Sequence, residues 1–274
     1  MNNLQRQSNY RIDVRQVQDA MSPSRLPFTR ILKSENLKSR RSPCLKLALI
    51  MPLPLVFLGL LMAVSTPKAL MATYAWNYWV FLLCPIMLVL VCSTTANLDR
   101  KQRLRTVLAL PINPARIWLA KCCRVVMLLV LSNLVVWVLT TVFGSAYGLQ
   151  VPKPLQGLAA VFCSTVMLSC MIPVSLWLTT SLGNLAGIAI PFLIELVGSV
   201  LAGGISVWWL VPPCGIMRVI APLIGVLPDG SPITAGDPLN SFGLFNWLAL
   251  LMALLIVAVL IALTAGWFSR RETK

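Results

Sequence analysis

The chain has 274 residues, of which 58% are hydrophobic and only 11% are charged, and its formal net charge is +15. So few charges beside so much apolar content exclude an ordinary soluble domain, in which about a quarter of the residues are charged. The chain contains no histidine, so it lacks the commonest general base and the commonest metal ligand. We therefore expect no catalytic site and no metal site in it.

Residues 1–28 are predicted to form a polar, basic tail. Residues 29–46 then show the pattern of an amphipathic entry helix, with Thr29 at its start and Pro43 marking its end. Its expected contact residues are Ile31, Leu32, Glu35 and Lys38. Anionic lipid alone does not explain an acid on the apolar face, so two interpretations stay open: a helix lying on lipid, or a helix contacting a cationic protein partner.

Six apolar runs follow, each long enough to cross roughly 30 Å of hydrocarbon. They are Leu47–Ser65, Trp76–Ala96, Val125–Phe143, Leu155–Leu176, Gly187–Leu210 and Phe245–Phe268. The expected fold is an all-α integral membrane protein with a six-span domain over residues 47–268 and a short tail at 269–274.

The basic residues predict the orientation of these spans. Twenty of the 23 Lys and Arg residues lie before the first run, between the second and third, or after the sixth. Positive loops stay on the cytoplasmic side, so both termini are expected in the cytoplasm of a bacterial cell. The positive charge then reflects orientation and attraction to anionic lipid rather than nucleic-acid binding.

The segment between the second and third runs, LRTVLALPINPARIWLAK, is predicted to form a helix, a corner and a second helix. Pro111 ends the first helix, and Asn113-Pro114 is a strong start signal for the helix that continues into the third run. The first helix is a candidate coupling helix that would fit a groove on a soluble ATPase, with Leu104, Arg105, Val107, Leu108, Leu110 and Pro111 as its contact residues. The alternative is a stiff connecting loop.

Glu195 is the isolated acid of the fifth run, where a charge is costly unless it faces protein or water. It is a candidate substrate or hinge residue, and the alternative is a helix–helix hydrogen bond to a residue such as Asn133. The small residues that follow it predict close helix packing more than substrate contact. They are Gly198, Ser199, Ala202, Gly203 and Ser206.

The proline-rich stretch before the sixth run is too apolar for a free loop and too interrupted to span. We expect a re-entrant or interfacial pair of helices that shapes the outer mouth. Trp208 and Trp209 are assigned to an interfacial aromatic belt, and Arg218 to an interaction with lipid head groups.

Several short motifs resemble the permeases of lantibiotic-immunity ABC transporters (the MutE/EpiE/NisE-like group), a branch of the type-2 ABC permeases. The resemblance covers about a third of the chain, in family order. It rests on Glu35, Lys38, Trp76, Trp79, Pro85, Asp99, Leu110, Pro111, Trp118, Lys121, Pro212, Arg218, Pro228, Asp229 and Gly230. The basic tail before position 28 departs from the family pattern.

The resemblance implies six spans per subunit and a complex of two permease subunits, identical or sister chains, with two ATPase subunits. ATP and Mg²⁺ would bind to the ATPase, and this chain would bind no cofactor. The expected substrate is a lantibiotic-like antimicrobial peptide, expelled from the membrane to protect its producer. Two other functions stay open: an export permease for another lipophilic compound, and a non-transporting membrane scaffold or sensor that binds peptide.

Overall fold

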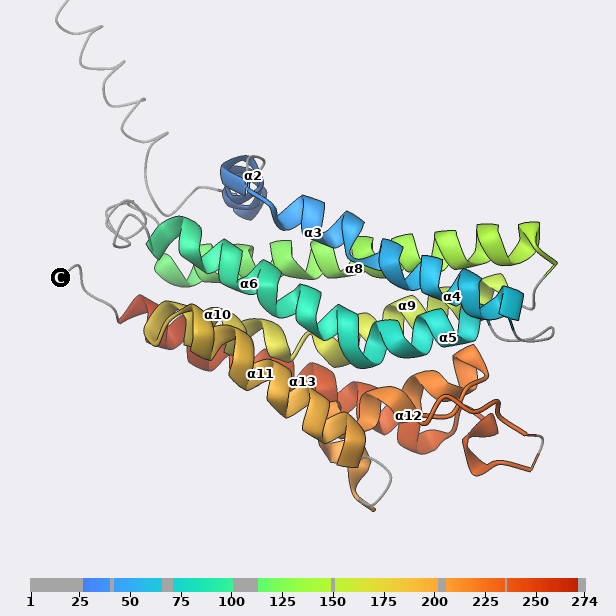
Figure 1. Cartoon of the computed structure of the whole chain (residues 1–274). Coiled ribbons are helices and arrows are strands. Elements are labelled where there is room, and N and C mark those ends of the chain that lie inside the picture. Colours follow the sequence, from blue (N-terminus) through green and yellow to red (C-terminus); the bar gives the residue numbers. More distant parts are fainter. Residues whose placement is uncertain are drawn as a thin grey trace, which may run out of the picture.

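The computed structural model describes residues 27–39, 42–65, 71–100, 113–148, 151–201, 206–234 and 236–270. These residues fold into helices and turns, with an isolated bridge between Val226 and Pro232 as the sole β feature among them. The helices form an elongated bundle (Figure 1). We call its two ends the α2 end and the α12 end, after the short helices that lie there.

Five helical segments are long and apolar enough to cross a membrane. They are Ala75–Leu98, Pro114–Ala146, Pro154–Ser181, Asn184–Leu201 and Leu244–Ser269. The chain is therefore a helical membrane protein, and the sixth span stays a prediction.

The predicted first span consists of two helices, α3 (Cys44–Ile50) and α4 (Pro52–Ser65), joined at Met51. They continue each other along the bundle, on the outside of α8 (Figure 1). The helix expected over residues 29–46 is also divided, because α2 (Phe28–Ser39) ends before Pro43. Proline disfavours helical geometry in the residue before it, which explains a helix end there.

The second span contains a local break at its proline. After α5 (Met71–Tyr78), the π-helical turn η2 (Trp79–Leu83) leads into α6 (Cys84–Arg100). Pro85 has no amide hydrogen to donate to the carbonyl of Phe81, so the regular hydrogen-bond ladder cannot continue through this turn.

The third span is the long helix α8 (Pro114–Ala146). Its start agrees with the sequence prediction: the Asn113 side chain accepts a hydrogen bond of 2.9 Å from the Ala115 amide, and Pro114 is the first helical residue. The predicted second helix of the polar insert and the third span are thus a single continuous helix.

The fourth span is α9 (Pro154–Leu168) followed by α10 (Met171–Ser181), with a turn at Ser169 and Cys170. Pro173 lacks the amide that would bond the Ser169 carbonyl, and the Ile172 amide bonds that carbonyl instead at 3.1 Å. This shift of the hydrogen-bond pattern accounts for the turn in mid-span.

The predicted fifth span is wrong at its C-terminal end. Its helix, α11, is described over Asn184–Leu201, and the predicted end of the span at Leu210 lies in a separate 3₁₀ turn, η3 (Trp208–Leu210). Val211 is extended, as expected of a residue that precedes Pro212.

The region before the last span contains a single α-helix rather than the expected pair. This helix, α12 (Pro212–Ile224), ends at Gly225, whose φ of +74° suits a left-handed cap. A turn region with the short 3₁₀ helix η4 (Pro238–Asn240) then leads to α13 (Leu244–Ser269). α12 is mostly buried, and it packs against α9, α11 and α13.

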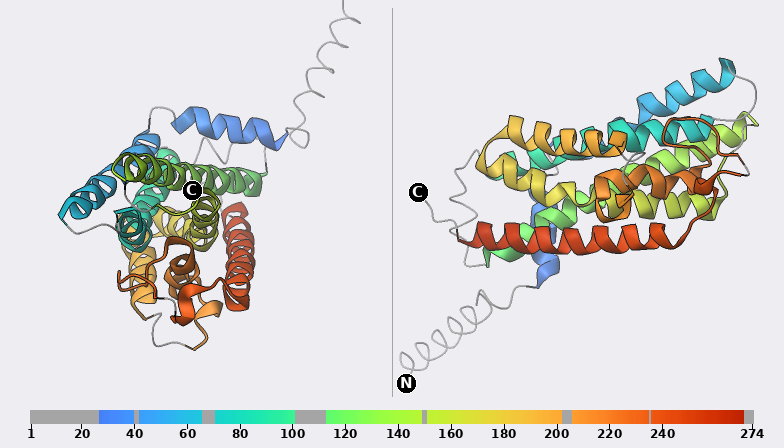
Figure 2. Two further views of the ribbon diagram at one scale, coloured as in Figure 1. Left: turned by 90° about the vertical axis from the view of Figure 1, so that its right-hand side faces the viewer. Right: turned by 90° about the horizontal axis from the view of Figure 1, so that it is seen from below.

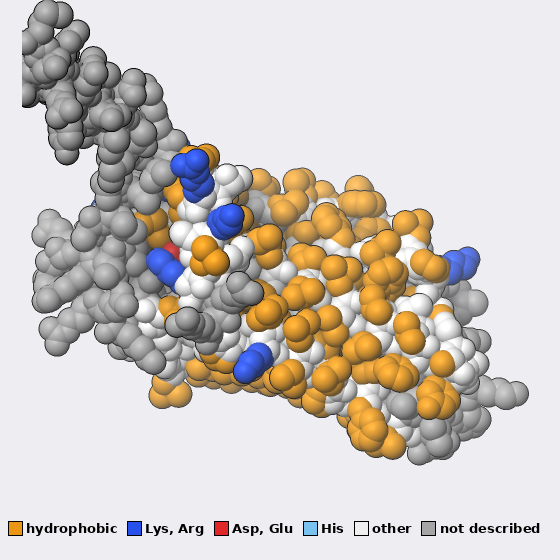
Figure 3. Space-filling model, turned by 90° about the horizontal axis from the view of Figure 1, so that it is seen from above, with side chains coloured by type: hydrophobic (Ala, Val, Ile, Leu, Met, Phe, Trp, Pro, Cys, Tyr) orange, Lys and Arg blue, Asp and Glu red, His pale blue; other side chains and the backbone are white. Residues whose placement is uncertain are grey.

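The surface of the bundle agrees with its membrane assignment. Hydrophobic side chains cover most of the face in Figure 3, and the Lys and Arg side chains of that face lie mainly around α2. The buried core, by contrast, is centred on η2, α6, α8, α9 and α12.

Candidate functional site

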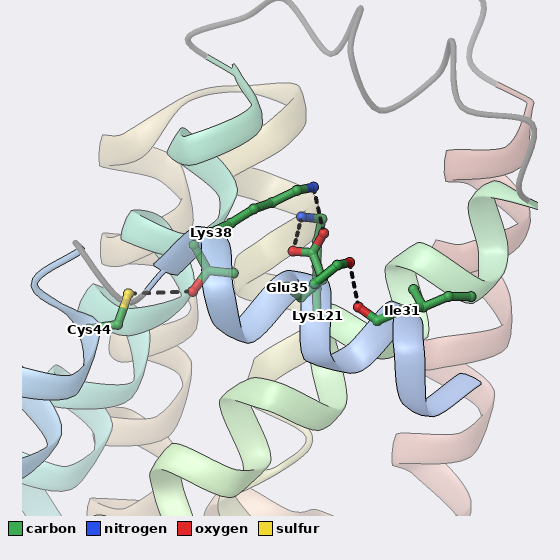
Figure 4. Close-up of polar contacts among 7 residues, drawn as sticks. Ile31, Glu35, Lys38, Cys44 and Lys121 are labelled. Atoms are coloured by element: carbon green, nitrogen blue, oxygen red, sulfur yellow. Dashed lines mark hydrogen bonds and ion pairs between the residues drawn. The ribbon is translucent and has the colours of Figure 1, made fainter. Parts of the chain in front are cut away.

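An ion-pair cluster fastens α2 to the bundle. α2 lies across the bundle axis and contacts the N-terminal part of α8 (Figure 2). Glu35 of α2 accepts a hydrogen bond of 2.9 Å from the Lys121 ammonium of α8 and one of 2.8 Å from Lys38 (Figure 4). Glu35 and Lys121 are both buried, and Ile31 is buried one turn before Glu35. The partner of the acid is therefore within the same chain.

Electrostatics keep this carboxylate ionised. Burial raises the pKa of the Glu35 carboxyl, but the opposing charges and hydrogen bonds of Lys121 and Lys38 outweigh it, so the pKa lies below its ordinary value. A buried carboxylate that is bonded on both oxygens is strongly held, and Lys121 matters most because it is the buried partner of the two.

A second contact fastens the next helix to α6. The Cys44 thiol, at the start of α3, lies 2.9 Å from the hydroxyl of Thr94 (Figure 4). It also lies 3.7 Å from the hydroxyl of Thr95. The Ser42 hydroxyl accepts a hydrogen bond from the Cys44 amide. The helices on the two sides of Pro43 are thus both fastened to the bundle: Glu35 joins α2 to α8, and Cys44 joins α3 to α6.

Aromatic packing joins α8 to the end of α13. The Trp118 ring lies 4.9 Å from the Phe268 ring, and its indole N–H donates to the Thr264 hydroxyl at 2.9 Å. Trp267 packs edge-on against Trp177 of α10, with the ring centroids 6.2 Å apart. The α2 end is therefore cross-linked by α2, α8, α10 and α13.

The predicted coupling residues lie outside the described residues. These are Leu104, Arg105, Val107, Leu108, Leu110 and Pro111. The structure places the two flanks of that segment at the α2 end: α6 ends at Arg100, and α8 begins at Pro114 (Figure 1).

Glu195 lines a cavity of about 210 Å³ inside the bundle. Glu195 is 1% exposed, and its Oε2 has no hydrogen-bond partner among the residues that the structure describes. The other residues around the cavity are apolar or cysteine and come from α10, α11, the start of α12 and α13: Cys170, Met171, Val174, Pro191, Ile194, Val211, Pro212, Pro213, Ile256 and Leu260.

Asn133 is not the hydrogen-bond partner of Glu195, which corrects that alternative. Its side-chain oxygen accepts from the Trp79 indole at 2.8 Å, and its amide donates to Thr165 at 3.1 Å. Asn133 is fully buried, so it joins η2, α8 and α9 as a structural link.

The small residues after Glu195 differ in their surroundings: two are packed, one is exposed, and two are not described by the structure. Gly198 and Ser199 pack on α12, where the Ser199 hydroxyl donates to the Pro213 carbonyl at 3.2 Å. Ser206 is exposed. Ala202 and Gly203 lie outside the described residues. Among the described members of the set, Gly198 and Ser199 therefore show the expected close packing, and Ser206 does not.

The predicted outer-mouth residues lie together at the α12 end. The Arg218 guanidinium stacks over the Trp208 ring, 5.4 Å from its centroid, instead of reaching freely toward lipid. Trp208 is buried rather than part of an exposed belt, whereas Trp209 packs near Phe245 with ring centroids 6.4 Å apart.

Two buried cations of α8 were missed as site residues. Lys121 entered the sequence analysis only as part of a motif, and Arg124, which is 4% exposed, was counted only as a basic loop residue. Both lie on the helix face of the buried Ile117, at spacings of four and seven residues. That periodicity is the signal that would have found them.

Comparison with known proteins places this arrangement in a family. The model of the ABC-2 family transporter proteins matches residues 31–202, more than half of the chain, so the chain belongs to the ABC-2 transporter family. It is thus a membrane permease subunit of an ABC transporter, a class that works with a separate ATPase subunit. No curated protein and no solved structure matched the chain.

Proposed function

We propose that this permease subunit belongs to an exporter that expels a lantibiotic-like antimicrobial peptide from the bacterial cytoplasmic membrane and so protects the producing cell. Two copies of a cytoplasmic ATPase, which bind ATP and Mg²⁺, supply the energy. A second permease subunit, the same chain or a sister chain, completes the translocation unit.

The observation that carries the coupling to an ATPase is the fixed geometry of the α2 end. α8 begins directly after the segment that carries the predicted coupling residues, and the Glu35–Lys121 pair fastens α2 to it. A displacement that reaches the capped start of α8 would therefore move a 33-residue helix that is fastened to α2. Slack at this point would absorb the movement of the ATPase.

Support for a cationic peptide substrate comes from Glu195. A buried carboxylate with an unpaired oxygen in an otherwise apolar wall is costly, and such groups in membrane helices mark substrate or ion pathways. The motifs shared with lantibiotic-immunity permeases point to the same substrate class.

The test combines partner capture with a protection assay. The tagged chain is purified from its native host, and the proteins that copurify are identified; an ATPase with a phosphate-binding loop is expected. The chain and this ATPase are then expressed in a lantibiotic-sensitive bacterium, and survival in the peptide is measured. Survival should rise with the intact pair and return to the level of the empty host when the phosphate-loop lysine of the ATPase is replaced by alanine.

Two outcomes would point to the other functions. Protection that persists without ATP hydrolysis would indicate a peptide-binding scaffold or sensor. ATPase capture without any peptide protection would indicate an export permease for another lipophilic compound.

A further inference from the structure

The cavity at Glu195 is held open by the way α11 packs on its neighbours. Near its start, Gly187 approaches α10 so closely that a Cβ there would lie 1.9 Å from the Thr179 hydroxyl. Near its end, Gly198 approaches α12, where a Cβ would lie 2.5 Å from the Pro213 side chain. Glu195 lies between these two close contacts, so the wall beside it cannot collapse without moving both.

Prolines, which lack a backbone amide hydrogen, interrupt the regular helical hydrogen bonds around the same cavity. Pro191 has no amide for the carbonyl of Gly187, and the Ser175 hydroxyl of α10 donates to that carbonyl at 2.7 Å. The facing span turns at Ser169 and Cys170, and α12 starts at Pro212. Backbone that departs from regular helix inside a membrane protein is tolerated where it is buried or lines a cavity.

The position and size of the cavity restrict what it can hold. Glu195 lies about 16 Å along α11 from its first residue, well inside the span. An apolar cavity of about 150 Å³ accommodates a benzene-sized group. At about 210 Å³ this cavity therefore has room for one side chain and not for a whole peptide. Ile194 and Val211, which line it, are also exposed on the apolar outer surface, so it is reachable from the membrane side.

We propose that this cavity binds one aliphatic side chain with an ammonium end, such as a lysine of the exported peptide, with Glu195 pairing with the ammonium. The apolar wall takes the methylene stem, and Oε2 of Glu195, which has no partner in the structure, accepts the hydrogen bond. The assignment rests on the proposed function for the origin of the ammonium, but the binding itself does not depend on transport.

The test measures binding to the purified chain in phosphatidylcholine nanodiscs, without ATPase or ATP. The probe is hexylammonium, and the neutral control is hexanol; heats measured with empty nanodiscs are subtracted. Hexylammonium should bind with a defined Kd, whereas hexanol should bind more weakly because it carries no charge to pair with the carboxylate. Glu195→Gln should weaken binding by roughly tenfold to a hundredfold, the effect of losing a hydrogen bond to a charged group.

A second variant guards against a folding defect in the first. Ile256→Trp fills the cavity from α13 and leaves the carboxylate in place, so it should also abolish hexylammonium binding. Both variants should keep the thermal unfolding temperature of the native chain. Equal binding of hexylammonium by the native chain and Glu195→Gln would overturn the proposal, as would binding that survives Ile256→Trp.

The source of the ammonium is decided separately. Peptide protection should fall in Glu195→Gln cells with unchanged ATPase copurification, and Glu195→Asp should restore part of it. If mass spectrometry instead finds phosphatidylethanolamine retained by the native chain and lost from Glu195→Gln, the ammonium comes from lipid and the peptide assignment is overturned. A failure of hexylammonium binding beside intact peptide protection would reject this inference and leave the proposed function standing.

Discussion

At the scale of single residues, the charged groups of the chain divide into exposed ones that orient it and buried ones that hold it together. Glu35 and Lys121 belong to the second group: both side chains are about 95% buried and 2.9 Å apart. Lys38 bonds the same carboxylate, but its side chain is 38% exposed. This difference makes the two lysines a matched pair for experiment.

Replacing Lys121 with alanine should destabilise the fold by about 3–5 kcal/mol, because it removes the buried partner of Glu35 and leaves this buried carboxylate with the partly exposed Lys38 alone. Lys38→Ala should cost about 1 kcal/mol or less, since water screens an exposed pair. Thermal unfolding in detergent, followed by tryptophan fluorescence, measures both changes. Equal effects of the two substitutions would contradict the buried ion pair.

The same cluster predicts a dependence of stability on pH. Because the folded-state pKa of Glu35 lies below its ordinary value of 4.5, the ionised carboxylate contributes stability that is fully present above that value. This contribution is lost as the pH falls through the lowered folded-state pKa. The difference in unfolding temperature between the native chain and Glu35→Gln should therefore be constant from pH 7 to 5 and shrink in more acidic buffer. A difference that grows on acidification would contradict the sign of the shift.

At the scale of helices, glycine decides how closely α11 and α12 approach. Gly198→Ala should destabilise the chain by about 1–3 kcal/mol, because the added methyl overlaps the Pro213 ring and the helices must separate. The control is Gly266→Ala in α13, where a Cβ meets no atom within 4 Å. That change should be neutral or stabilise by up to about 1 kcal/mol, the helix-propensity gain of alanine over glycine. Unfolding temperatures of the two variants in the same detergent test this contrast, and a loss of stability in both would indicate a general effect of glycine replacement.

Start and stop signals predicted some elements better than others. Asn113-Pro114 gave the first turn of α8 correctly, because capping is a local interaction between a side chain and the next amides. The end of the fifth span was placed at Leu210, which belongs to a 3₁₀ turn and not to α11. A hydropathy run continues through residues such as Val207 whether or not the backbone stays helical, so it could not locate that end.

At the scale of the whole molecule, the prediction that separates a coupling element from an ordinary loop concerns Leu104 and Leu108. Replacing both with Asp removes apolar contact worth about 1.5–3 kcal/mol per buried side chain and places charges in the contact surface. The variant should insert normally but lose ATPase copurification or substrate-stimulated ATP hydrolysis. The control is Tyr147→Asp, an exposed residue beyond the far end of α8. Normal copurification and stimulated hydrolysis in the Leu104/Leu108 variant would reduce the segment to a connecting loop.

The sequence by itself determined the class of the protein. Long apolar runs predict membrane helices because unpaired backbone groups are too costly in hydrocarbon, and this requirement holds for each segment separately. The all-helical fold and the start of α8 were predicted from such local patterns, whereas membership of the type-2 ABC permeases was predicted from the resemblance of short motifs to that family. The lantibiotic-like substrate stays a proposal.

Only the tertiary structure decided which polar groups meet. The acid on α2 was recognised, but its partner Lys121 is 86 positions away and was identified only when α2 packed across α8. Asn133 was an example of a possible hydrogen-bond partner for Glu195, and in the structure it bonds Trp79 and Thr165 instead. Pairing between helices depends on how they rotate and cross, which hydropathy and capping do not encode. For that reason only the structure showed that Glu195 has an unpaired oxygen and lines a cavity.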